Sequence, residues 1–284
     1  MLTVLEIIKR TTDFLAGRGV ENPRLNAELL IGHGLGLKRM QLYLQFERPL
    51  TEQELERIRP VVRRRGQREP LQYILGEAEF CGLSLRVDRR ALIPRPETEY
   101  LVELVTARWA TPPSRILDLG TGTGALALAL ANAFPEATVV AVDSSADALA
   151  LAAENARIHN LEARVGLIES DWFERVPCET KFDLIVSNPP YLTATETAVA
   201  SPEVKEFEPV GALTGSGDDG AGDLRKIIAG APAFLAAGGM LALETGIAQH
   251  SVLLEACGRA GFATSESLQD LTKRDRYVIA KMGA

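Results

Sequence analysis

Four residues in the second half of the chain have the types and order needed to hold a planar amino group. Asn188-Pro189-Pro190-Tyr191 follows the apolar run 182–187, which is typical of a buried strand. Prolines lack the N–H donor of a strand ladder, so the chain must leave the sheet here. The residue before each proline is held extended, which fixes the direction of the Asn188 side chain and of the Pro189 carbonyl. Two rigid acceptors beside an aromatic ring suit a planar –NH2 group, although a proline-rich turn without a ligand has the same pattern.

A glycine-rich turn is the second candidate site. Asp118-Leu119-Gly120-Thr121-Gly122-Thr123-Gly124 lies between a predicted strand and a predicted helix, where glycines let the backbone approach a ligand. Asp143 ends the next predicted strand, and a carboxylate about twenty residues after such a turn can accept both ribose hydroxyls of an adenosine. Gly120, Gly122 and Ala125 equally fit the dinucleotide fingerprint, in which a helix N-terminus holds pyrophosphate. The spacing alone leaves both cofactors open, as well as a tight turn without a ligand.

Further side chains favour S-adenosylmethionine over a dinucleotide. The Asp118 carboxylate suits the ammonium group of a methionine and would repel a pyrophosphate. Asp171-Trp172 ends the third predicted strand, where an acid and a ring can pair with and cover an adenine, although Trp172 alone fits a core aromatic equally well. Asn188 follows the fourth strand, and open α/β sheets bind ligands at these carboxyl ends. The predicted cofactor-binding residues are Asp118, Gly120, Thr121, Gly122, Thr123, Gly124, Asp143, Asp171, Trp172 and Asn188.

Alternating strands and helices must position these side chains. We predict strands at 116–119, 138–142, 164–169, 184–187 and 240–243, helices at 125–134, 146–159, 223–235 and 250–260, and two closing strands that end at residue 279. This alternation predicts an α/β fold with a mostly parallel, doubly wound sheet and helices on both faces. The stretch 193–222 is rich in Glu, Pro and Gly and is predicted as a long irregular excursion, which in compact domains is usually functional or mobile.

The first part of the chain predicts a small helical domain. Four or five short helices fit residues 1–68, with capping boxes at Thr3 and Thr51 and an N-cap at Asn22 before Pro23. Glycines and alternating apolar positions in 73–88 predict a β-hairpin. The predicted domains are therefore a helical domain at 1–68, a hairpin linker at 69–90 and a cofactor-binding domain at 91–284. The basic run Arg63-Arg64-Arg65 with Arg68 is interpreted as a solvated face, with an RNA-like or acidic protein partner as the alternative.

Composition excludes several classes of function. The chain has 284 residues, 46% apolar and 24% charged, which is ordinary for a soluble globular protein. Its net charge of −7 disfavours a large nucleic-acid footprint. Three scattered cysteines form no metal-binding spacing, and three scattered histidines (His33, His159 and His250) are predicted as surface or capping residues. With no leader-like start and no long apolar span, we expect a cytoplasmic protein without metal or membrane contact.

The motifs together resemble a known enzyme family. The segments 117–124, 141–143, 170–173 and 186–191 resemble the motifs of class I S-adenosylmethionine methyltransferases. A fuller pattern resembles the peptide chain release factor glutamine methyltransferases, known as PrmC or HemK; it comprises 24–30 with 36–37, 73–76 with Phe80, 92–99 and 207–209. The resemblance covers nearly the whole chain, and the combination of 93–99 with 188–191 is quite specific. The C-terminal stretch 238–246 matches only loosely, and no site residue is assigned from it.

This resemblance implies a Rossmann-like fold that methylates the side-chain amide nitrogen of the glutamine in the Gly-Gly-Gln loop of bacterial release factors. The predicted catalytic residues are Asn188, Pro189, Pro190 and Tyr191, and the helical domain would dock the release factor. One alternative is a methyltransferase for adenine N6 or guanine N2 on a flipped base, but the net charge and the helical N-terminal part argue against it. Another is a binding module without activity, which the intact Asn188 to Tyr191 motif and Asp143 disfavour. We expect a monomer that does not bind nucleic acid directly.

Overall fold

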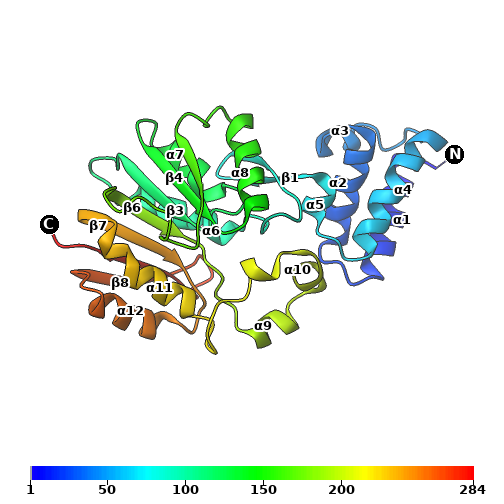
Figure 1. The fold of residues 1–284 in the computed structure, drawn as a ribbon. Helices are drawn as coiled ribbons and strands as arrows, with labels where there is room; N and C mark the ends of the chain where they lie inside the picture. The colour runs from blue at the N-terminus through cyan, green and yellow to red at the C-terminus, as the bar shows by residue number, and fades with distance from the viewer. Residues whose placement is uncertain (1) are drawn as a thin grey trace. The chain divides into compact units, whose positions relative to one another are not determined.

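The computed structural model describes residues 2–284, and the chain divides into two units (Figure 1). The helical unit consists of Met1–Glu77 together with Ser201–Phe207. The sheet unit consists of Ala78–Ala200 together with Glu208–Ala284. The chain therefore leaves the sheet unit once, for a short segment, and returns.

The sheet unit is built on seven strands in the order β5-β4-β3-β6-β7-β9-β8. Their bounds are β3 (Arg115–Leu119), β4 (Thr138–Asp143), β5 (Val165–Glu169), β6 (Phe182–Ser187), β7 (Leu235–Glu244), β8 (Thr264–Gln269) and β9 (Asp275–Lys281). The first five strands of that order are parallel, and β9 is antiparallel to both of its neighbours. In β3, Ile116 pairs with Val139 of β4 and with Leu184 of β6, so the strand order reverses at β3. The predicted α/β, mostly parallel, doubly wound fold is confirmed.

Helices cover both faces of this sheet because its central strands are apolar on both sides. One core cluster holds side chains of α6 (Pro96–Thr106), α7 (Ala125–Ala133) and α8 (Ala146–Ile158), and the other those of α11 (Gly222–Gly230) and α12 (His250–Arg259). Within β6, Leu184 and Val186 join the first cluster and Ile185 joins the second. Near-continuous burial of this kind is expected of parallel strands, and it leaves only their ends free for polar side chains.

A small hairpin packs onto the first core cluster. It is formed by β1 (Glu77–Phe80) and β2 (Leu83–Arg86), and Phe80 and Leu85 are fully buried in that cluster. The predicted hairpin is therefore confirmed over 77–86. Its predicted first part is wrong, because α5 (Leu71–Leu75) is a helix that ends at Gly76, whose φ of 80° is left-handed.

The helical unit contains α1 (Val4–Ala16), α2 (Pro23–Leu35), α3 (Arg39–Tyr43), α4 (Glu52–Gly66), α5 and α10 (Pro202–Phe207). Both predicted capping boxes are present, at Thr3 and at Thr51. Pro23 opens α2 as predicted, but Asn22 is not the expected side-chain cap. Its backbone is left-handed, with φ 48°, and its side chain makes no capping hydrogen bond.

The basic run at the end of α4 binds carboxylates of the same chain. Arg65 is 6% exposed, and its guanidinium donates to Asn26 Oδ1 at 2.7 Å and to Glu203 Oε1 at 3.0 Å. Arg68 donates to both oxygens of Glu203 at 2.6 Å, and Arg64 pairs with Glu69 at 2.8 Å. The interpretation of this run as a solvated face is therefore wrong, because two of its arginines anchor α10.

The stretch 193–222 is more ordered than predicted. It contains α9 (Ala194–Val199), α10 and the 3-10 helix η1 (Val210–Ala212). A capping box at Thr193 and Glu196 starts α9. The predicted irregular excursion is thus wrong in its local structure, since short helices of about six residues have too little periodicity to stand out among Glu, Pro and Gly.

Candidate active site

A cavity of about 460 Å³ lies in the sheet unit at the carboxyl ends of its parallel strands. Its wall includes 120–123 after β3, 143–145 after β4, 170–172 after β5, and Asn188 and Pro190 after β6. Residues 90–95, Pro209, Gly211 and Ala212 form further parts of the wall. Because the strand order reverses at β3, this is the edge at which doubly wound sheets bind ligands.

The glycine-rich turn forms one side of the cavity. Gly120 and Gly122 have φ values of 72° and 55°, in the left-handed region that side chains with a Cβ rarely adopt. The backbone N–H groups of Gly120 and Thr121 donate to the Val142 carbonyl at 2.8 and 2.9 Å, which ties the turn to β4. A Cβ on Gly120 would also lie 3.5 Å from the ring of Trp172. The turn is therefore built to keep the backbone close to whatever occupies the cavity.

Asp143 is held at the end of β4 by two backbone amides. Its Oδ2 accepts from Gly122 N at 2.9 Å, and its Oδ1 accepts from Ser145 N at 2.9 Å. Burial raises the pKa of this carboxyl group above its usual value, while the backbone amides oppose that rise. Each carboxylate oxygen keeps a further lone pair, so a fixed Asp143 can still accept hydroxyl groups from the cavity.

Asp118 lies behind the glycine-rich turn and does not line the cavity. It is fully buried, and its Oδ2 accepts from Thr121 Oγ1 at 2.6 Å and from Ala127 N at 3.1 Å. Among residues 2–284, no hydrogen-bond partner is present for its Oδ1. Burial raises the pKa of Asp118 to about 7. An orphaned carboxylate oxygen of this kind fits a site that a cationic group completes.

Asp171 and Trp172 follow β5 and line the cavity together. Trp172 has a left-handed φ of 45°, which is uncommon for a bulky side chain. Its ring packs partly against the second core cluster and partly beside Gly120. The ring is thus both a core aromatic and a face of the cavity.

The Asn188 to Tyr191 turn closes the cavity after β6. Ser187 ends the strand, and its hydroxyl donates to the Leu119 carbonyl at 2.6 Å, which joins the end of β6 to that of β3. Asn188 and Pro190 line the cavity, whereas Pro189 is buried. Tyr191 does not line it; the Tyr191 hydroxyl donates to Glu244 Oε1 at 3.1 Å, and the Tyr191 carbonyl accepts from Gln249 Nε2 at 2.9 Å.

Burial raises the pKa of the Tyr191 hydroxyl, with the negative charge of Glu244 acting in the same direction. The guanidinium of Arg276 lies 5.9 Å from the centre of the Tyr191 ring. The turn is therefore anchored on three sides, which makes it a rigid support for the Asn188 side chain.

Known proteins are similar to this chain over nearly its whole length. The PrmC N-terminal domain matches residues 6–76, and the methyltransferase small domain matches 96–205. A release factor glutamine methyltransferase of Geobacter sulfurreducens is 44% identical over 281 residues, covering 99% of this chain and 97% of that protein. One of Chlorobaculum tepidum is 43% identical over 287 residues, covering 96% and 95%.

The chain belongs to the release factor glutamine methyltransferase family. A solved methyltransferase from Pyrococcus furiosus has the same fold in part, with a TM-score of 0.54 and 20% identity over 72% of this chain and 90% of that one. The class I methyltransferase fold is thus confirmed, and membership of a methyltransferase family supports S-adenosylmethionine as the cofactor.

Most of the residues predicted for this methyltransferase site come together in the cavity. Those that line it are Gly120, Thr121, Gly122, Thr123, Asp143, Asp171, Trp172, Asn188 and Pro190. Those that do not line it are Asp118, Gly124, Pro189 and Tyr191. Gly124 instead caps α7, where a Cβ would lie 3.3 Å from Ala152 Cβ.

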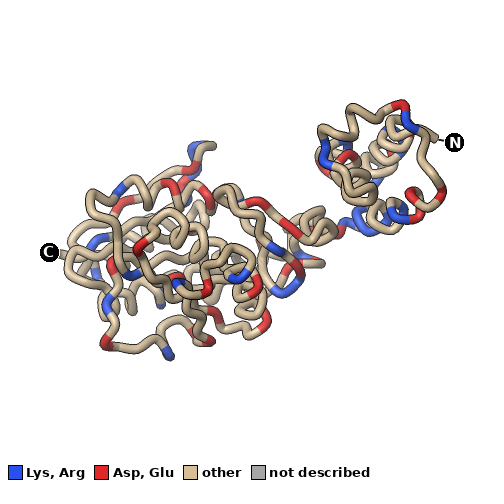
Figure 2. Tube along the Cα trace, turned by 90° about the horizontal axis from the view of Figure 1, so that it is seen from above, with Lys and Arg blue, Asp and Glu red and all other residues tan. Residues whose placement is uncertain are grey.

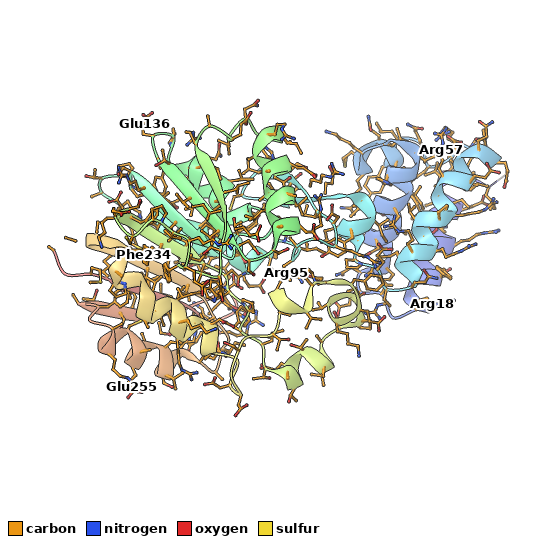
Figure 3. The ribbon with its side chains drawn as sticks, in the orientation of Figure 1. Arg18, Arg57, Arg95, Glu136, Phe234 and Glu255 are labelled. Carbon is orange, nitrogen blue, oxygen red and sulfur yellow. The ribbon has the colours of Figure 1, made fainter. Side chains whose placement is uncertain are left out.

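Sequence reasoning missed two pairs of residues at the methyltransferase cavity, in each of which one member lines the cavity (Thr98 and Arg95) and pairs with a buried acid (Glu244 and Glu208). Thr98 Oγ1 accepts from Asn188 Nδ2 at 3.0 Å and donates to Glu244 Oε2 at 2.7 Å. Arg95, labelled in Figure 3 at the start of α6, donates to Glu208 Oε1, which is buried beside cavity residue Pro209. A signal for Glu244 existed, since it is a lone acid at the carboxyl end of an apolar strand.

Three further findings concern residues 2–284 as a whole. This range contains no group of three His, Cys, Asp or Glu side chains able to hold a metal ion. None of its helices is long and apolar enough to cross a membrane. The prediction of His250 as a surface or capping residue is wrong, because it is 6% exposed and the N-cap of α12 is Gln249. The His250 ring lies between the hydroxyls of Thr245 and Ser267, at 2.8 and 2.7 Å.

Proposed function

We propose that this chain transfers a methyl group from S-adenosylmethionine to the side-chain amide nitrogen (N5) of the glutamine in the Gly-Gly-Gln loop of bacterial peptide chain release factors. The observation that carries the proposal is the shared cavity, since Asn188 lines the same space as the glycine-rich turn and Asp143. The names of the matched relatives support the choice of substrate. No specific feature of the cavity favours a nucleobase instead.

The proposed cofactor site uses the first three strand ends. Asp143 would accept the ribose hydroxyls, and Trp172 with Asp171 would cover and pair with the adenine. Asp118 would hold Thr121 of the glycine-rich turn in place and, in its ionised form, would supply negative charge behind the turn. When bound, S-adenosylmethionine supplies a methyl group on a positively charged sulfur, so no strong base is needed before attack.

The proposed catalytic work of Asn188 and Pro189 is to position and polarise a poor nucleophile. The lone pair of an amide nitrogen is delocalised into its carbonyl group. If Asn188 Oδ1 and the Pro189 carbonyl accept its two N–H groups, the nitrogen lone pair is directed at the methyl group, about 3–3.5 Å away before reaction. The nitrogen becomes tetrahedral and positive in the transition state, so these acceptors then bind it more strongly.

Tyr191 and Pro190 would complete the substrate pocket. Pro190 lines the cavity, and we propose that the Tyr191 ring packs against the glutamine side chain while Glu244 holds its hydroxyl. One amide proton leaves in exchange for the methyl group, so the product nitrogen is a neutral secondary amide.

The helical unit is proposed to dock the release factor, with 1–68, 69–90 and 91–284 as the working division into domains. The reason is that every residue lining the cavity comes from the sheet unit. In Figure 2, basic and acidic residues are interspersed along the trace of the sheet unit, in keeping with the net charge of −7. That the chain acts as a monomer in the cytoplasm, without metal and without direct contact to nucleic acid, stays a prediction.

A labelled-methyl experiment tests the proposal. The protein is incubated with S-adenosylmethionine labelled in the methyl group and with separate pools of unmodified release factor, tRNA, rRNA and DNA. We expect label in the release factor alone. Label in a nucleic-acid pool, or in none, would overturn the proposed substrate.

A further inference from the structure

The proposed mechanism requires one orientation of the Asn188 side-chain amide. An asparagine side chain presents an acceptor oxygen on one side and a donor NH2 on the other, and the two ends have nearly the same shape. Only the orientation with Oδ1 toward the substrate can accept a hydrogen from the glutamine –NH2. Packing alone discriminates weakly between the two orientations, so a hydrogen-bonding partner must do so.

Thr98 is that partner. It is the third residue of α6 and only 5% exposed, and its Oγ1 lies 3.0 Å from Asn188 Nδ2 and 2.7 Å from Glu244 Oε2. A hydroxyl group has a single hydrogen to donate. Burial raises the pKa of Glu244, and the hydrogen bonds from Thr98 and Tyr191 and the charge of Arg276 oppose that rise. In its ionised form Glu244 can only accept, so the Thr98 hydrogen then belongs to Glu244 and the Thr98 oxygen accepts from Asn188. Because the Thr98 oxygen accepts this hydrogen bond, the NH2 end of Asn188 points toward Thr98 and away from the substrate.

Glu244 determines the donor and acceptor direction of each hydrogen bond in this network. It ends β7, is 1% exposed, and accepts from Thr98 of α6 on one oxygen and from Tyr191 on the other. Arg276 of β9 donates to the Tyr191 hydroxyl at 3.3 Å, which leaves the hydrogen of that hydroxyl for Glu244 as well. Two hydrogen bonds, from Thr98 of α6 and from Tyr191 after β6, therefore converge on one buried acceptor, and their directions are mutually dependent.

We propose that Thr98 and Glu244 are positioning residues, which hold the Asn188 amide with its oxygen toward the substrate nitrogen. This inference rests on the proposed function. A merely structural role, in which the same bonds only satisfy buried polar groups, predicts a loss of stability without a selective loss of turnover. The positioning role and the merely structural role predict different values of kcat for Thr98 variants, and different effects of those variants when Asn188 is also substituted.

Thr98→Val removes the hydroxyl and keeps the shape, and Thr98→Ser keeps the hydroxyl. We expect Thr98→Val to lower kcat for release factor methylation about 10²-fold, as misplacement of a reacting group does. Thr98→Ser should stay within about threefold of the wild type, and the Kd for S-adenosylmethionine should change less than about threefold in both variants, because a misplaced group affects the reaction step. Thr106→Val is the matched control, since the Thr106 hydroxyl lies on the same helix and donates only to carbonyls within it, at 2.9 and 3.0 Å.

Glu244→Gln tests whether the Glu244 carboxylate sets the direction of these hydrogen bonds. An amide has one acceptor oxygen and one NH2 group, so it cannot accept from Thr98 and from Tyr191 together. We expect a loss of kcat comparable to that of Thr98→Val, with the cofactor Kd again serving as the check on folding. If Glu244→Gln does not fold, Thr98→Val alone decides the matter.

A double-mutant cycle separates this inference from the function on which it rests. If Thr98 acts through Asn188, Thr98→Val should lower kcat no further once Asn188→Ala is present. Equal fold losses in both backgrounds, or wild-type kcat in Thr98→Val, would overturn the positioning role. If Asn188→Ala itself turns over at the wild-type rate, the proposed mechanism fails instead.

Discussion

Asp143 is the carboxylate whose loss should act most directly on cofactor binding. It lines the cavity and is fixed by two backbone amides. We expect Asp143→Ala to leave buried ribose hydroxyls without an acceptor, which costs about 1–3 kcal/mol, or roughly 5- to 150-fold in Kd. Calorimetric titration with S-adenosylmethionine measures this, with the exposed Asp147→Ala as control. An unchanged Kd would remove Asp143 from the site.

Asp118 should make folding stability depend on pH near neutrality. Its pKa is raised to about 7 by burial, whereas an unfolded chain releases this proton near pH 4. The folded state therefore holds a proton that the unfolded state loses. The contribution to stability is full below pH about 4 and is lost as the pH rises through about 7, by up to about 1.4 kcal/mol per unit.

The measurement is urea unfolding of the wild type and Asp118→Asn between pH 5 and 8. The variant has no proton to lose, so the wild type should become less stable relative to it as the pH rises. A constant difference between the two proteins across this range would show that Asp118 does not titrate there.

At the scale of elements, one asparagine joins the hairpin to the glycine-rich turn. Asn155 of α8 is fully buried; its Oδ1 accepts from Arg86 N at 2.7 Å, and its Nδ2 donates to the carbonyls of Arg86 and Thr123 at 3.0 and 2.9 Å. We expect Asn155→Ala to destabilise the protein by about 1–3 kcal/mol for each buried backbone group left unpaired. Urea unfolding measures the loss, and the exposed Asn132→Ala on α7 should change little. Equal stabilities of the two variants would contradict this role.

The order of elements in the sheet unit follows from the sequence because each central strand is an apolar run bounded by turn residues. Short helices such as α5 have no comparable sequence pattern. In α5, Tyr73 and Ile74 are both buried, which resembles a strand in so short a segment, although Pro70 before it and Gly76 after it are helix-boundary signals. The helix α10 depends on Arg65 and Arg68, more than 130 residues away, and no local pattern contains such a contact.

The candidate site likewise contains residues that the sequence predicts and contacts that it does not. Residues that follow the strands were predictable, because all parallel strands end at one edge of the sheet. The bonds of Thr98 to Asn188 and Glu244 span 90 and 146 residues, so they exist only in the folded chain. The unpaired oxygen of Asp118 is likewise a property of packing rather than of sequence.

For the whole molecule, a truncated sheet unit should keep the hairpin of β1 and β2. A cut at residue 90 would remove Phe80, Leu83 and Leu85 from the core of the sheet unit, where all three are buried. A protein of residues 78–284 keeps them. We expect it to bind S-adenosylmethionine within about threefold of the full chain, because the cavity lining lies within 90–226.

The same truncated protein should methylate release factor poorly. It lacks the proposed docking unit, and α10 loses Arg65 and Arg68 as partners of Glu203. Steady-state kinetics should show a lower kcat/KM, with most of the loss in KM. Equal kcat/KM for the two proteins would contradict the docking role of the helical unit.

The central claim is that Asn188 holds a glutamine amide for methylation, and one experiment tests it most directly. Unmodified release factor is incubated with S-adenosylmethionine and either the wild type or Asn188→Ala, and the Gly-Gly-Gln peptide is sequenced by fragmentation mass spectrometry over time. We predict a single methyl group on the glutamine side-chain nitrogen, formed about 10²–10³-fold more slowly by the variant, since it lacks one preorganised acceptor. Wild-type turnover by Asn188→Ala, or a methyl group on any other atom, would contradict the account.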